Sequence, residues 1–244
     1  MNVLIIGATS GIGSTVAQVF SQEGYNVICS SRDEEQLGYL ISDLEIRYGR
    51  KPCAAPIDLT KISSITGFVR RLYEDFKTID CVVVTAATMP GNETEYYDEE
   101  SLINTTMTNF IGIASVLNEI SRRMINNNSG MIICLSSVAG ERGRQSNFIY
   151  GASKSALNTY LQGLRSKLFK HNVYVITVLP GYVDTLMSYG KVKSQFAVSP
   201  YYVARKIYKL TKNKKDIVYV PSVWWLIMKI IKLIPEAIFK RLNL

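Results

Sequence analysis

Tyr150 and Lys154, in the segment YGASK, are the residue types in this sequence best suited to proton transfer. In a helix, side chains four residues apart share one face. An ammonium beside a phenol favours the phenolate and lowers the pKa of the tyrosine, which can then exchange protons near neutral pH. Ser137 lies thirteen residues upstream, at the end of an apolar run, where its hydroxyl can hydrogen-bond a substrate carbonyl. Singly, each has an ordinary structural explanation; together they indicate acid–base chemistry on a carbonyl or alcohol.

A glycine-rich turn, GATSGIG at residues 7–13, separates the first apolar run from a helical pattern. Gly7 permits a tight turn, Gly11 lets the backbone approach a pyrophosphate, and Gly13 lets the helix lie close to the sheet. The free N–H groups of the helix N-terminus would then face the phosphates. The turn predicts a dinucleotide site, with a tight turn that binds no ligand as the alternative.

The end of the second apolar run bears on the choice of cofactor. A site selective for NAD usually places an acid there to bind the ribose 2′-hydroxyl, but here Ser31 stands in that place and Arg32 follows. A guanidinium can bind the 2′-phosphate of NADP in bidentate fashion. The segment therefore favours NADP(H) over NAD(H), with a plain surface arginine as the alternative. Asp33 is expected to cap the next helix.

The elements that must position these residues alternate along the chain. Apolar runs separated by amphipathic segments predict a parallel sheet covered on both faces. The expected fold is a single-domain α/β Rossmann fold, a doubly wound parallel sheet, over residues 1–220, with residues 221–244 as an amphipathic helical extension of the same domain. The expected strands are residues 2–7, 26–31, 53–59, 80–87, 131–137 and 173–181, and the expected helices are 14–23, 34–48, 62–76, 101–126 and 150–170.

Taken together, these motifs resemble the short-chain dehydrogenase/reductase family over residues 1–220. The motifs that carry the resemblance are GATSGIG at 7–13, Asp58-Leu59, Asn109 in TNFIG, Ser137 in SSVAG, YGASK at 150–154 and PGYVDT at 180–185.

The resemblance implies a role for each matching residue. Tyr150 would be the general acid in carbonyl reduction or the base in alcohol oxidation, and Lys154 would also hold the nicotinamide ribose. Ser137 would orient the carbonyl, Asn109 would support a water in a proton relay, and Asp58 would bind the adenine. The backbone after Pro180 would hold the carboxamide. The implied cofactor contacts are Gly7, Thr9, Ser10, Gly11, Ile12, Gly13, Ser31, Arg32, Asp58, Leu59, Thr85, Ala86, Tyr150, Lys154, Pro180, Gly181, Val183 and Thr185.

Two positions depart from the family pattern. Ile6 stands where the family usually has Thr, and Thr85-Ala86-Ala87-Thr88 replaces Asn-Asn-Ala-Gly. The side chains usually found there make hydrogen bonds around the cofactor, so cofactor affinity is expected to differ. Members of the family also pair helices equivalent to 101–126 and 150–170 across a two-fold axis, which implies a homodimer or a homotetramer.

Charge is unevenly distributed along the chain. The net charge is +8, but residues 191–244 hold 12 Lys+Arg and 2 acids, whereas residues 1–190 hold 16 Lys+Arg and 18 acids. A basic C-terminal fifth suggests an anionic partner, such as a lipid headgroup or a phosphate-bearing substrate, or else a solvated lysine face. No nucleic-acid-binding motif accompanies it. Four cysteines without CxxC spacing and a sole histidine predict free thiols and no metal site. No signal peptide is recognised, so a cytoplasmic location is expected.

The last segment, PSVWWLIMKIIKLIPEAIFKRLNL from residue 221, is apolar with scattered lysines. Its apolar run is too short for a transmembrane helix, which needs about 20 residues. Trp224, Ile227, Ile230, Ile231 and Ile234 are expected on one face, with Lys229 and Lys232 on another, and Pro235 at the first position of a second short helix. This pattern fits a helix covering the core, a lid over the substrate cleft, or a peripheral contact with the inner face of a membrane through residues 222–244.

The tail also weakly resembles reductases of polyprenyl-phosphate sugars. The expected activity is therefore NADPH-dependent reduction of a carbonyl to an alcohol, with a keto-sugar, lipid-linked or otherwise anionic, from glycan biosynthesis as one substrate. A 3-oxoacyl thioester and a generic carbonyl compound are the alternatives, and a cofactor-bound sensor or scaffold is the non-enzymatic one. Loops 89–100 and 186–200 are expected to select the substrate, with Lys191 and Lys193 available to an anion.

Overall fold

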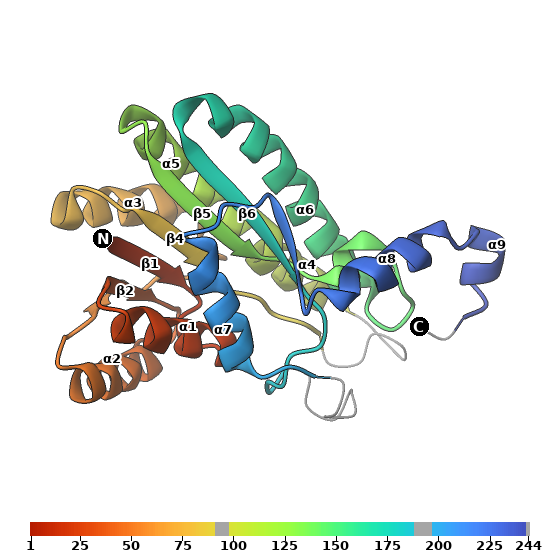
Figure 1. Ribbon diagram of the computed structural model, residues 1–244, viewed down its shortest axis with the longest axis horizontal. Helices are drawn as coiled ribbons and strands as arrows, with labels where there is room; N and C mark the ends of the chain where they lie inside the picture. Colours follow the sequence, from red (N-terminus) through yellow and green to blue (C-terminus); the bar gives the residue numbers. More distant parts are fainter. Residues whose placement is uncertain (91–97, 188–196, 243–244) are drawn as a thin grey trace.

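Seven parallel strands form one sheet in the order β3-β2-β1-β4-β5-β6-β7. The structure is a computed structural model that describes residues 1–90, 98–187 and 197–242. Helices lie on both faces of the sheet (Figure 1), which confirms the expected single-domain doubly wound α/β fold. The strands are Asn2–Ile6 (β1), Asn26–Ser30 (β2), Cys53–Ala54 (β3), Cys81–Val84 (β4), Gly130–Leu135 (β5), Val173–Pro180 (β6) and Ile217–Val220 (β7).

The helices form two layers. One layer contains α1, α2 and α7, and the other contains α3, α5 and α6, as the two buried clusters on either side of the sheet show. The α-helices are Gly11–Gln22 (α1), Glu34–Tyr48 (α2), Ile62–Phe76 (α3), Glu99–Thr106 (α4), Gly112–Asn126 (α5), Phe148–Leu168 (α6), Pro200–Leu210 (α7), Val223–Leu233 (α8) and Glu236–Phe239 (α9). A π-helical turn, Met107–Ile111, joins α4 to α5, and short 3₁₀ turns span Val138–Glu141 and Phe169–His171.

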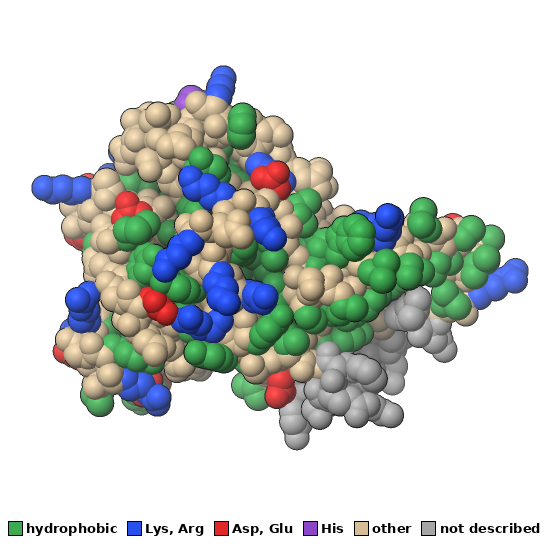
Figure 2. Space-filling view, in the orientation of Figure 1, with side chains coloured by type: hydrophobic (Ala, Val, Ile, Leu, Met, Phe, Trp, Pro, Cys, Tyr) green, Lys and Arg blue, Asp and Glu red, His purple; other side chains and the backbone are tan. Residues whose placement is uncertain are grey.

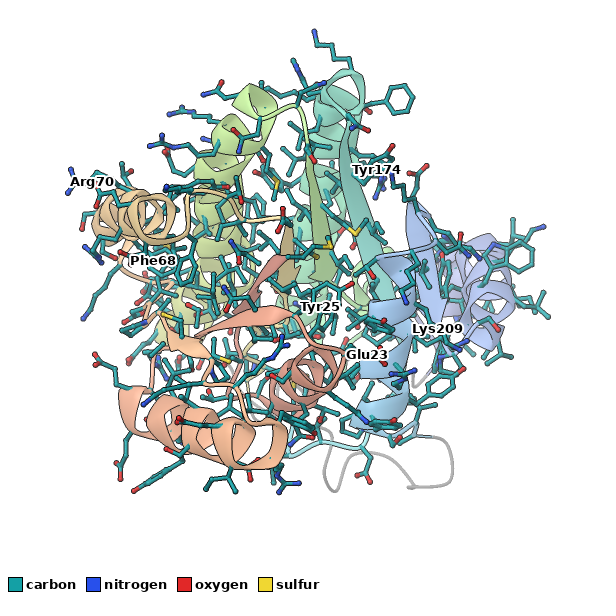
Figure 3. The ribbon with its side chains drawn as sticks, turned by 60° about the vertical axis from the view of Figure 1, so that its left-hand side comes forward. Glu23, Tyr25, Phe68, Arg70, Tyr174 and Lys209 are labelled. Atoms are coloured by element: carbon teal, nitrogen blue, oxygen red, sulfur yellow. The ribbon has the colours of Figure 1, made fainter. Side chains whose placement is uncertain are left out.

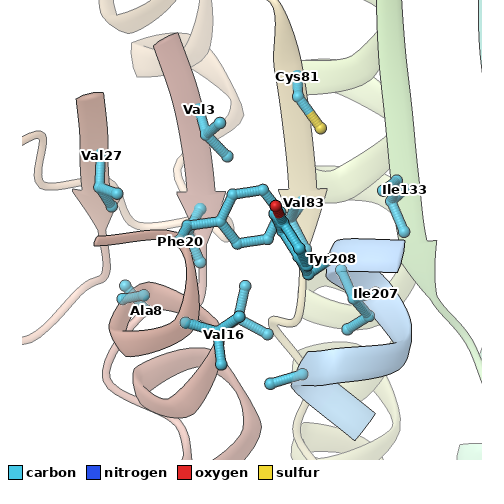
Figure 4. Close-up of a cluster of buried hydrophobic side chains, with 14 of the residues drawn as sticks. Val3, Ala8, Val16, Phe20, Val27, Cys81, Val83, Ile133, Ile207 and Tyr208 are labelled. Atoms are coloured by element: carbon cyan, nitrogen blue, oxygen red, sulfur yellow. The ribbon is translucent and has the colours of Figure 1, made fainter. Parts of the chain in front are cut away.

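Side chains from α1 and α7 meet over the centre of the sheet (Figure 4). Phe20 contacts Tyr208 edge to face, with ring centroids 5.8 Å apart, a preferred aromatic geometry. Around this pair, Glu23 and Tyr25 at the end of α1 lie near Lys209 of α7 (Figure 3), and the Glu23 carboxylate pairs with Arg205. On the other layer Phe68 is buried while Arg70 of the same helix points to solvent (Figure 3). This amphipathic arrangement fixes both layers on the sheet.

Four expected elements differ most from those observed. The predicted strand 53–59 is only Cys53–Ala54. Beyond it, Ala55 and Ile57 still donate to the carbonyls of Cys29 and Ser31, so the chain runs beside β2 past Pro56 without forming a regular strand. The single helix expected over 101–126 is divided by the π turn. The helices expected to begin at residues 14 and 150 begin at Gly11 and Phe148.

Helix α7 and strand β7 were not predicted at all. The lysines of this segment conceal an amphipathic pattern in which Val203, Ala204 and Ile207 are buried. Ser199 caps the helix by accepting from the Tyr202 N–H, and Pro200 occupies its first turn, as expected for a helix start. The expected anion contacts of Lys191 and Lys193 lie outside the described residues.

The C-terminal segment forms an arm that extends from the body of the domain (Figure 1). The inner face of α8 packs on the domain through Trp224 and Met228, the latter fully buried with Val138 and Leu179. Ile230, which was expected on one face with Trp224, is 57% exposed and does not share in this packing. Pro235 is the N-cap of α9 rather than its first residue. In the described part of the chain, no helix has the length and hydropathy that crossing a bilayer requires.

Candidate active site

A cavity of about 410 Å³ opens at the carboxyl ends of β1, β4, β5 and β6. This is the edge where ligands bind in doubly wound sheets. It brings together residues that lie far apart in the sequence. The lining residues include Thr9, Ser10, Gly11, Ile12, Thr85, Ser137, Tyr150, Lys154, Pro180, Gly181, Val183 and Thr185. The predicted residues that do not line the cavity are Gly7, Gly13, Ser31, Arg32, Asp58, Leu59, Ala86 and Asn109.

The glycine turn places the start of α1 against this cavity. Gly7 has a φ of +88°, which L side chains rarely adopt. A Cβ on Gly13 would overlap the carbonyl oxygen of Gly7, and one on Gly11 would lie 3.2 Å from Thr185 Cγ2. Ser10 caps the helix by accepting from the Gly13 N–H at 3.0 Å. The remaining N–H groups of the first turn lack helical partners and suit a phosphate.

Thr85 supports the turn from the neighbouring strand. Its hydroxyl lies 3.1 Å from the Ile6 carbonyl and 3.0 Å from the Gly7 carbonyl, and it donates to this pair of oxygens. The Ala86 N–H also donates to Ile6, at 3.0 Å. Ile6 itself is buried in the core. Although the sequence departs from the family pattern here, Thr85 anchors the turn and Ile6 contributes apolar packing.

A second group of predicted residues lies beyond the turn, and all of them except Thr9 lie outside the cavity lining. The Thr9 and Ser31 hydroxyls are 2.6 Å apart, and Arg32 is exposed. Burial alone would raise the pKa of Asp58, but hydrogen bonds from the Thr60 backbone and hydroxyl, and the charge of Arg32, lower it. Arg32 therefore lies close enough to Asp58 to act on its charge. Leu59 is buried in the core against Gly112 and does not reach the cavity.

Tyr150 lies in the first turn of α6, facing Ser137 at the end of β5. Burial raises the pKa of the Tyr150 phenol to about 12, and a hydrogen bond with the Ser137 side chain opposes that shift. The expectation that Lys154 lowers this pKa is wrong for the unliganded chain. The Lys154 Nζ is 5.7 Å from the centroid of the Tyr150 ring, and burial dominates the pKa of the phenol. The phenol is therefore protonated at neutral pH, which is the form an acid needs.

Lys154 is 1% exposed, so the alternative of a surface lysine is excluded. Its Nζ donates to the Leu135 carbonyl at 3.4 Å. Burial lowers the pKa of its ammonium to about 8. An ionisable group so strongly perturbed and lining a cavity is a hallmark of functional sites.

Asn109 belongs to the π turn, where such turns often mark functional sites. Its side chain accepts from the Thr88 N–H at 2.7 Å and donates to the Thr88 carbonyl at 2.8 Å. It also donates to the Ser153 hydroxyl at 3.1 Å. The side chain thus ties the end of β4 to α6 and does not line the cavity.

The segment after β6 forms the opposite wall. The Gly181 N–H donates to Val220 at 3.0 Å, and Val183 pairs with Val198 in an isolated parallel bridge. A Cβ on Gly181 would overlap the indole of Trp224. Helix α8 therefore contacts the cavity wall directly, and the tail shapes the site from behind.

Several lining residues were not predicted from the sequence. Arg144 and Asn147 reach the cavity from the loop between Ser137 and Tyr150. The sequence offered one signal, their place in the short segment between Ser137 and Tyr150, and it was a weak one because other residues of that segment, such as Arg142, do not line the cavity. Met89, Leu186 and Met187 come from the two loops expected to select the substrate. The other unpredicted lining residues are Ala87, Leu135, Ser136, Val138, Ala139 and Tyr182.

Comparison with known proteins agrees with this geometry. A family model described as short chain dehydrogenase matches residues 1–195. An uncharacterized oxidoreductase of Staphylococcus epidermidis is 31% identical over 77% of this chain and 80% of its own length. The 3-oxoacyl-[acyl-carrier-protein] reductase of Chlamydia muridarum is 29% identical over 77% of this chain and 75% of its own length.

Among solved structures, a short chain dehydrogenase from Burkholderia cenocepacia in complex with NADP superimposes with a TM-score of 0.84. It is 22% identical and covers 100% of this chain and 97% of its own. This likeness concerns the fold. The sequence match over residues 1–195 identifies the chain as a member of the short-chain dehydrogenase family of oxidoreductases.

Proposed function

We propose that the protein is an NADPH-dependent reductase that converts a carbonyl to an alcohol. The observation that carries this proposal is one cavity lined by Ser137, Tyr150 and Lys154 together with the glycine turn. Bound NADPH would supply the hydride that the carbonyl carbon accepts. A reduced carbonyl oxygen needs a proton, and Tyr150 is the group at this site that holds one at neutral pH.

Each residue has a distinct part in that reaction. The Ser137 hydroxyl, already paired with Tyr150, orients the carbonyl oxygen beside the phenol. The Lys154 ammonium stabilises the negative charge that develops as the phenol gives up its proton, and it would bind the ribose. Asn109 acts indirectly, by joining Thr88 to α6. Pro180, Gly181, Val183 and Thr185 present the backbone that would hold the carboxamide.

The cofactor fits the residues present. The first turn of α1 offers free N–H groups to the pyrophosphate, and Thr9, Ser31, Arg32 and Asp58 surround the position expected for the adenosine ribose. No acid takes the place of Ser31, and Arg32 is exposed and available to a 2′-phosphate. The Burkholderia structure was determined with NADP. NADPH is therefore proposed over NADH.

Replacing Arg32 tests this preference. For Arg32→Ala we expect the KM for NADPH to rise by about tenfold to hundredfold, the value of a charge-assisted hydrogen bond to phosphate, and the KM for NADH to change little. Arg70→Ala, on the exposed surface of α3, is the matched control. Equal changes in KM for NADPH and NADH would show that Arg32 does not bind the 2′-phosphate.

For the substrate, we propose a keto-sugar, lipid-linked or otherwise anionic, from glycan biosynthesis. The basic C-terminal fifth and the apolar arm beside the cavity support it. The similarity to a 3-oxoacyl thioester reductase favours that substrate class as the alternative. NADPH consumption should be followed over keto-sugars, 3-oxoacyl thioesters and simple ketones. A protein that binds NADPH yet reduces no member of this panel would be the sensor or scaffold instead.

A second proposal concerns the arm: its outer face rests on an anionic membrane surface. Helix α8 has apolar side chains on two faces, and the outer face exposes Trp225, Leu226, Ile230 and Leu233. Figure 2 shows these hydrophobic side chains continuing along the arm, with Lys and Arg side chains gathered over α7 on the same side of the molecule. An apolar stripe flanked by basic groups is complementary to anionic lipid.

Changing the outer face alone separates membrane contact from folding. For the triple variant Leu226→Gln, Ile230→Gln and Leu233→Gln, we expect normal NADPH turnover and at least about tenfold weaker co-sedimentation with phosphatidylglycerol vesicles, because buried apolar area is lost. Ile46→Gln on α2, an 84% exposed isoleucine, is the control. Wild-type protein that ignores these vesicles, or an arm that instead pairs two copies of the chain by light scattering, would refute the membrane proposal.

Self-association is proposed through the outer faces of α5 and α6. A shallow hollow there is lined mainly by small residues, including Ala152, Ala156 and Gly163, which allow close helix approach. Light scattering of the purified chain measures whether it forms the proposed homodimer or homotetramer, and a monomer at all concentrations would exclude both.

A further inference from the structure

Arg144 stands out among the charged residues of the loop between β5 and α6. Its neighbours are satisfied: Glu141 pairs with Lys232 at 2.6 Å, and Arg142 pairs with Glu236 at 2.9 Å. Among residues 1–90, 98–187 and 197–242, no carboxylate lies within ion-pairing distance of Arg144. Its Nη2 donates to the Met228 sulfur at 3.7 Å, a weak acceptor.

The guanidinium is held in place rather than free to swing into solvent. The Nε of Arg144 is shielded from solvent and has no acceptor among the described residues, a costly state for a cationic donor. Met228, which contacts the other end of the group, is fully buried under α8. The tail therefore fixes Arg144 at the wall of the cavity. Because Arg144 also lines the cavity, a ligand anion there would supply the partner that the described residues do not.

The position of Arg144 defines what that ligand can be. It lines the same cavity as Ser137 and Tyr150, beside apolar Met89 and Met187. A planar guanidinium binds the two oxygens of a carboxylate or phosphate in bidentate fashion. We propose that Arg144 binds an oxyanion of the substrate, a carboxylate or phosphate, and thereby selects ketones that carry one close to the reacting carbonyl. This inference deepens the proposed reductase function and rests on it.

Asn147 adds a feature to the same wall. Its Oδ1 is buried and has no hydrogen-bond donor in the described part of the chain. An amide oxygen accepts from a hydroxyl, so the wall offers one donor group for an oxyanion and one acceptor for a hydroxyl. Together they suit a hydroxylated, anionic ketone better than a purely apolar one.

Two matched pairs of ketones test the inference by turnover: 4-oxopentanoate against its methyl ester, and dihydroxyacetone phosphate against dihydroxyacetone. For Arg144→Met we expect kcat/KM for the preferred anionic ketone to fall by about tenfold to hundredfold, mainly through KM. The neutral partner should change less than about threefold. Arg144→Lys should recover part of the loss, and Arg70→Met controls for net charge. The pair of ketones in which only the anionic member loses kcat/KM shows whether Arg144 binds a carboxylate or a phosphate.

A binding measurement without turnover separates this inference from the reductase proposal. Calorimetric titration of the NADP-saturated protein with pentanoate and with methyl phosphate should show binding of one anion that Arg144→Met weakens by about tenfold or more. If neither anion binds wild-type protein, or the variant binds equally well, Arg144 is not an oxyanion site. If Arg144→Met loses anion binding but the wild-type protein reduces no ketone, the oxyanion site stands and the reductase proposal is refuted.

Discussion

Replacing Tyr150 with Phe is expected to lower kcat by about a thousandfold, within the range by which a positioned general acid accelerates a reaction. The phenol is the buried proton donor beside Ser137, and burial keeps it protonated, with a pKa raised to about 12. Phe preserves the ring and removes only the hydroxyl. The measurement is steady-state NADPH oxidation with the best ketone of the panel.

The control for this variant is cofactor affinity. NADPH binding, followed by nicotinamide fluorescence, should stay within about twofold of wild type, because the glycine turn and Arg32 are untouched. A parallel Tyr160→Phe variant removes a hydroxyl that only donates to the Ala114 carbonyl and should keep full turnover. If Tyr150→Phe retained turnover, the proposed acid would be wrong.

Replacing Lys154 with Met is expected to lower kcat/KM by at least about a hundredfold, since it removes the charge that stabilises the developing phenolate. The same change should not destabilise the fold. Lys154 is a buried cation that makes a long hydrogen bond to the Leu135 carbonyl, and removing a poorly compensated buried charge relieves its desolvation. Loss of activity with an unchanged or higher Tm distinguishes a chemical role from a structural one.

The pH dependence follows from the same residue. Burial lowers the pKa of Lys154 from 10.5 to about 8, whereas Tyr150 keeps its proton well above that pH. Wild-type kcat/KM for reduction should therefore be level below pH 8 and fall above it, as the ammonium is lost. Lys154→Met should lack this inflection. A wild-type profile level to pH 10 would mean that the charge on Lys154 is not needed.

The free energy of unfolding should depend on the same ionisation of Lys154, but this contribution should rise with pH where the activity falls. Below pH 8 Lys154 is charged in both folded and unfolded chains, and folding bears the full cost of burying the charge. Between about pH 8 and 10.5 the folded form is neutral while the unfolded form is still charged, so this cost declines as pH rises. The stability advantage of Lys154→Met over wild type should shrink across that window. Comparing the two proteins cancels much of the contribution from the buried thiols.

Sequence patterns predicted the fold well where strands are buried on both faces. Continuous apolar runs such as those of β1 and β5 could be located because parallel strands between helix layers show no alternation. The same patterns failed at the edge of the sheet and in the basic C-terminal part of the chain. The strand expected over residues 53–59 is only Cys53–Ala54, and the basic residues Arg205, Lys206 and Lys209 concealed α7.

For the site, helical spacing correctly placed Tyr150 and Lys154 on one face and in one cavity. It could not show that this face is buried, so the raised pKa of Tyr150 was not foreseen. The sequence analysis missed Arg144 because its significance depends on the lack of a carboxylate partner among the described residues, which only the three-dimensional arrangement reveals. The sequence of α8 is apolar on two faces and did not show which one packs on the domain. One face packs through Trp224 and Met228, and the other is exposed at Ile230 and Leu233.

The most direct test of the central claim is hydride transfer from cofactor to substrate. The protein should be incubated with NADPH deuterated at C4 and with the ketone panel, and the alcohols analysed by mass spectrometry and NMR. We predict deuterium on the carbinol carbon, with one NADPH consumed for each alcohol formed and no transfer by Tyr150→Phe. NADPH that binds but passes no deuterium to any ketone would contradict the account and favour a cofactor-bound sensor.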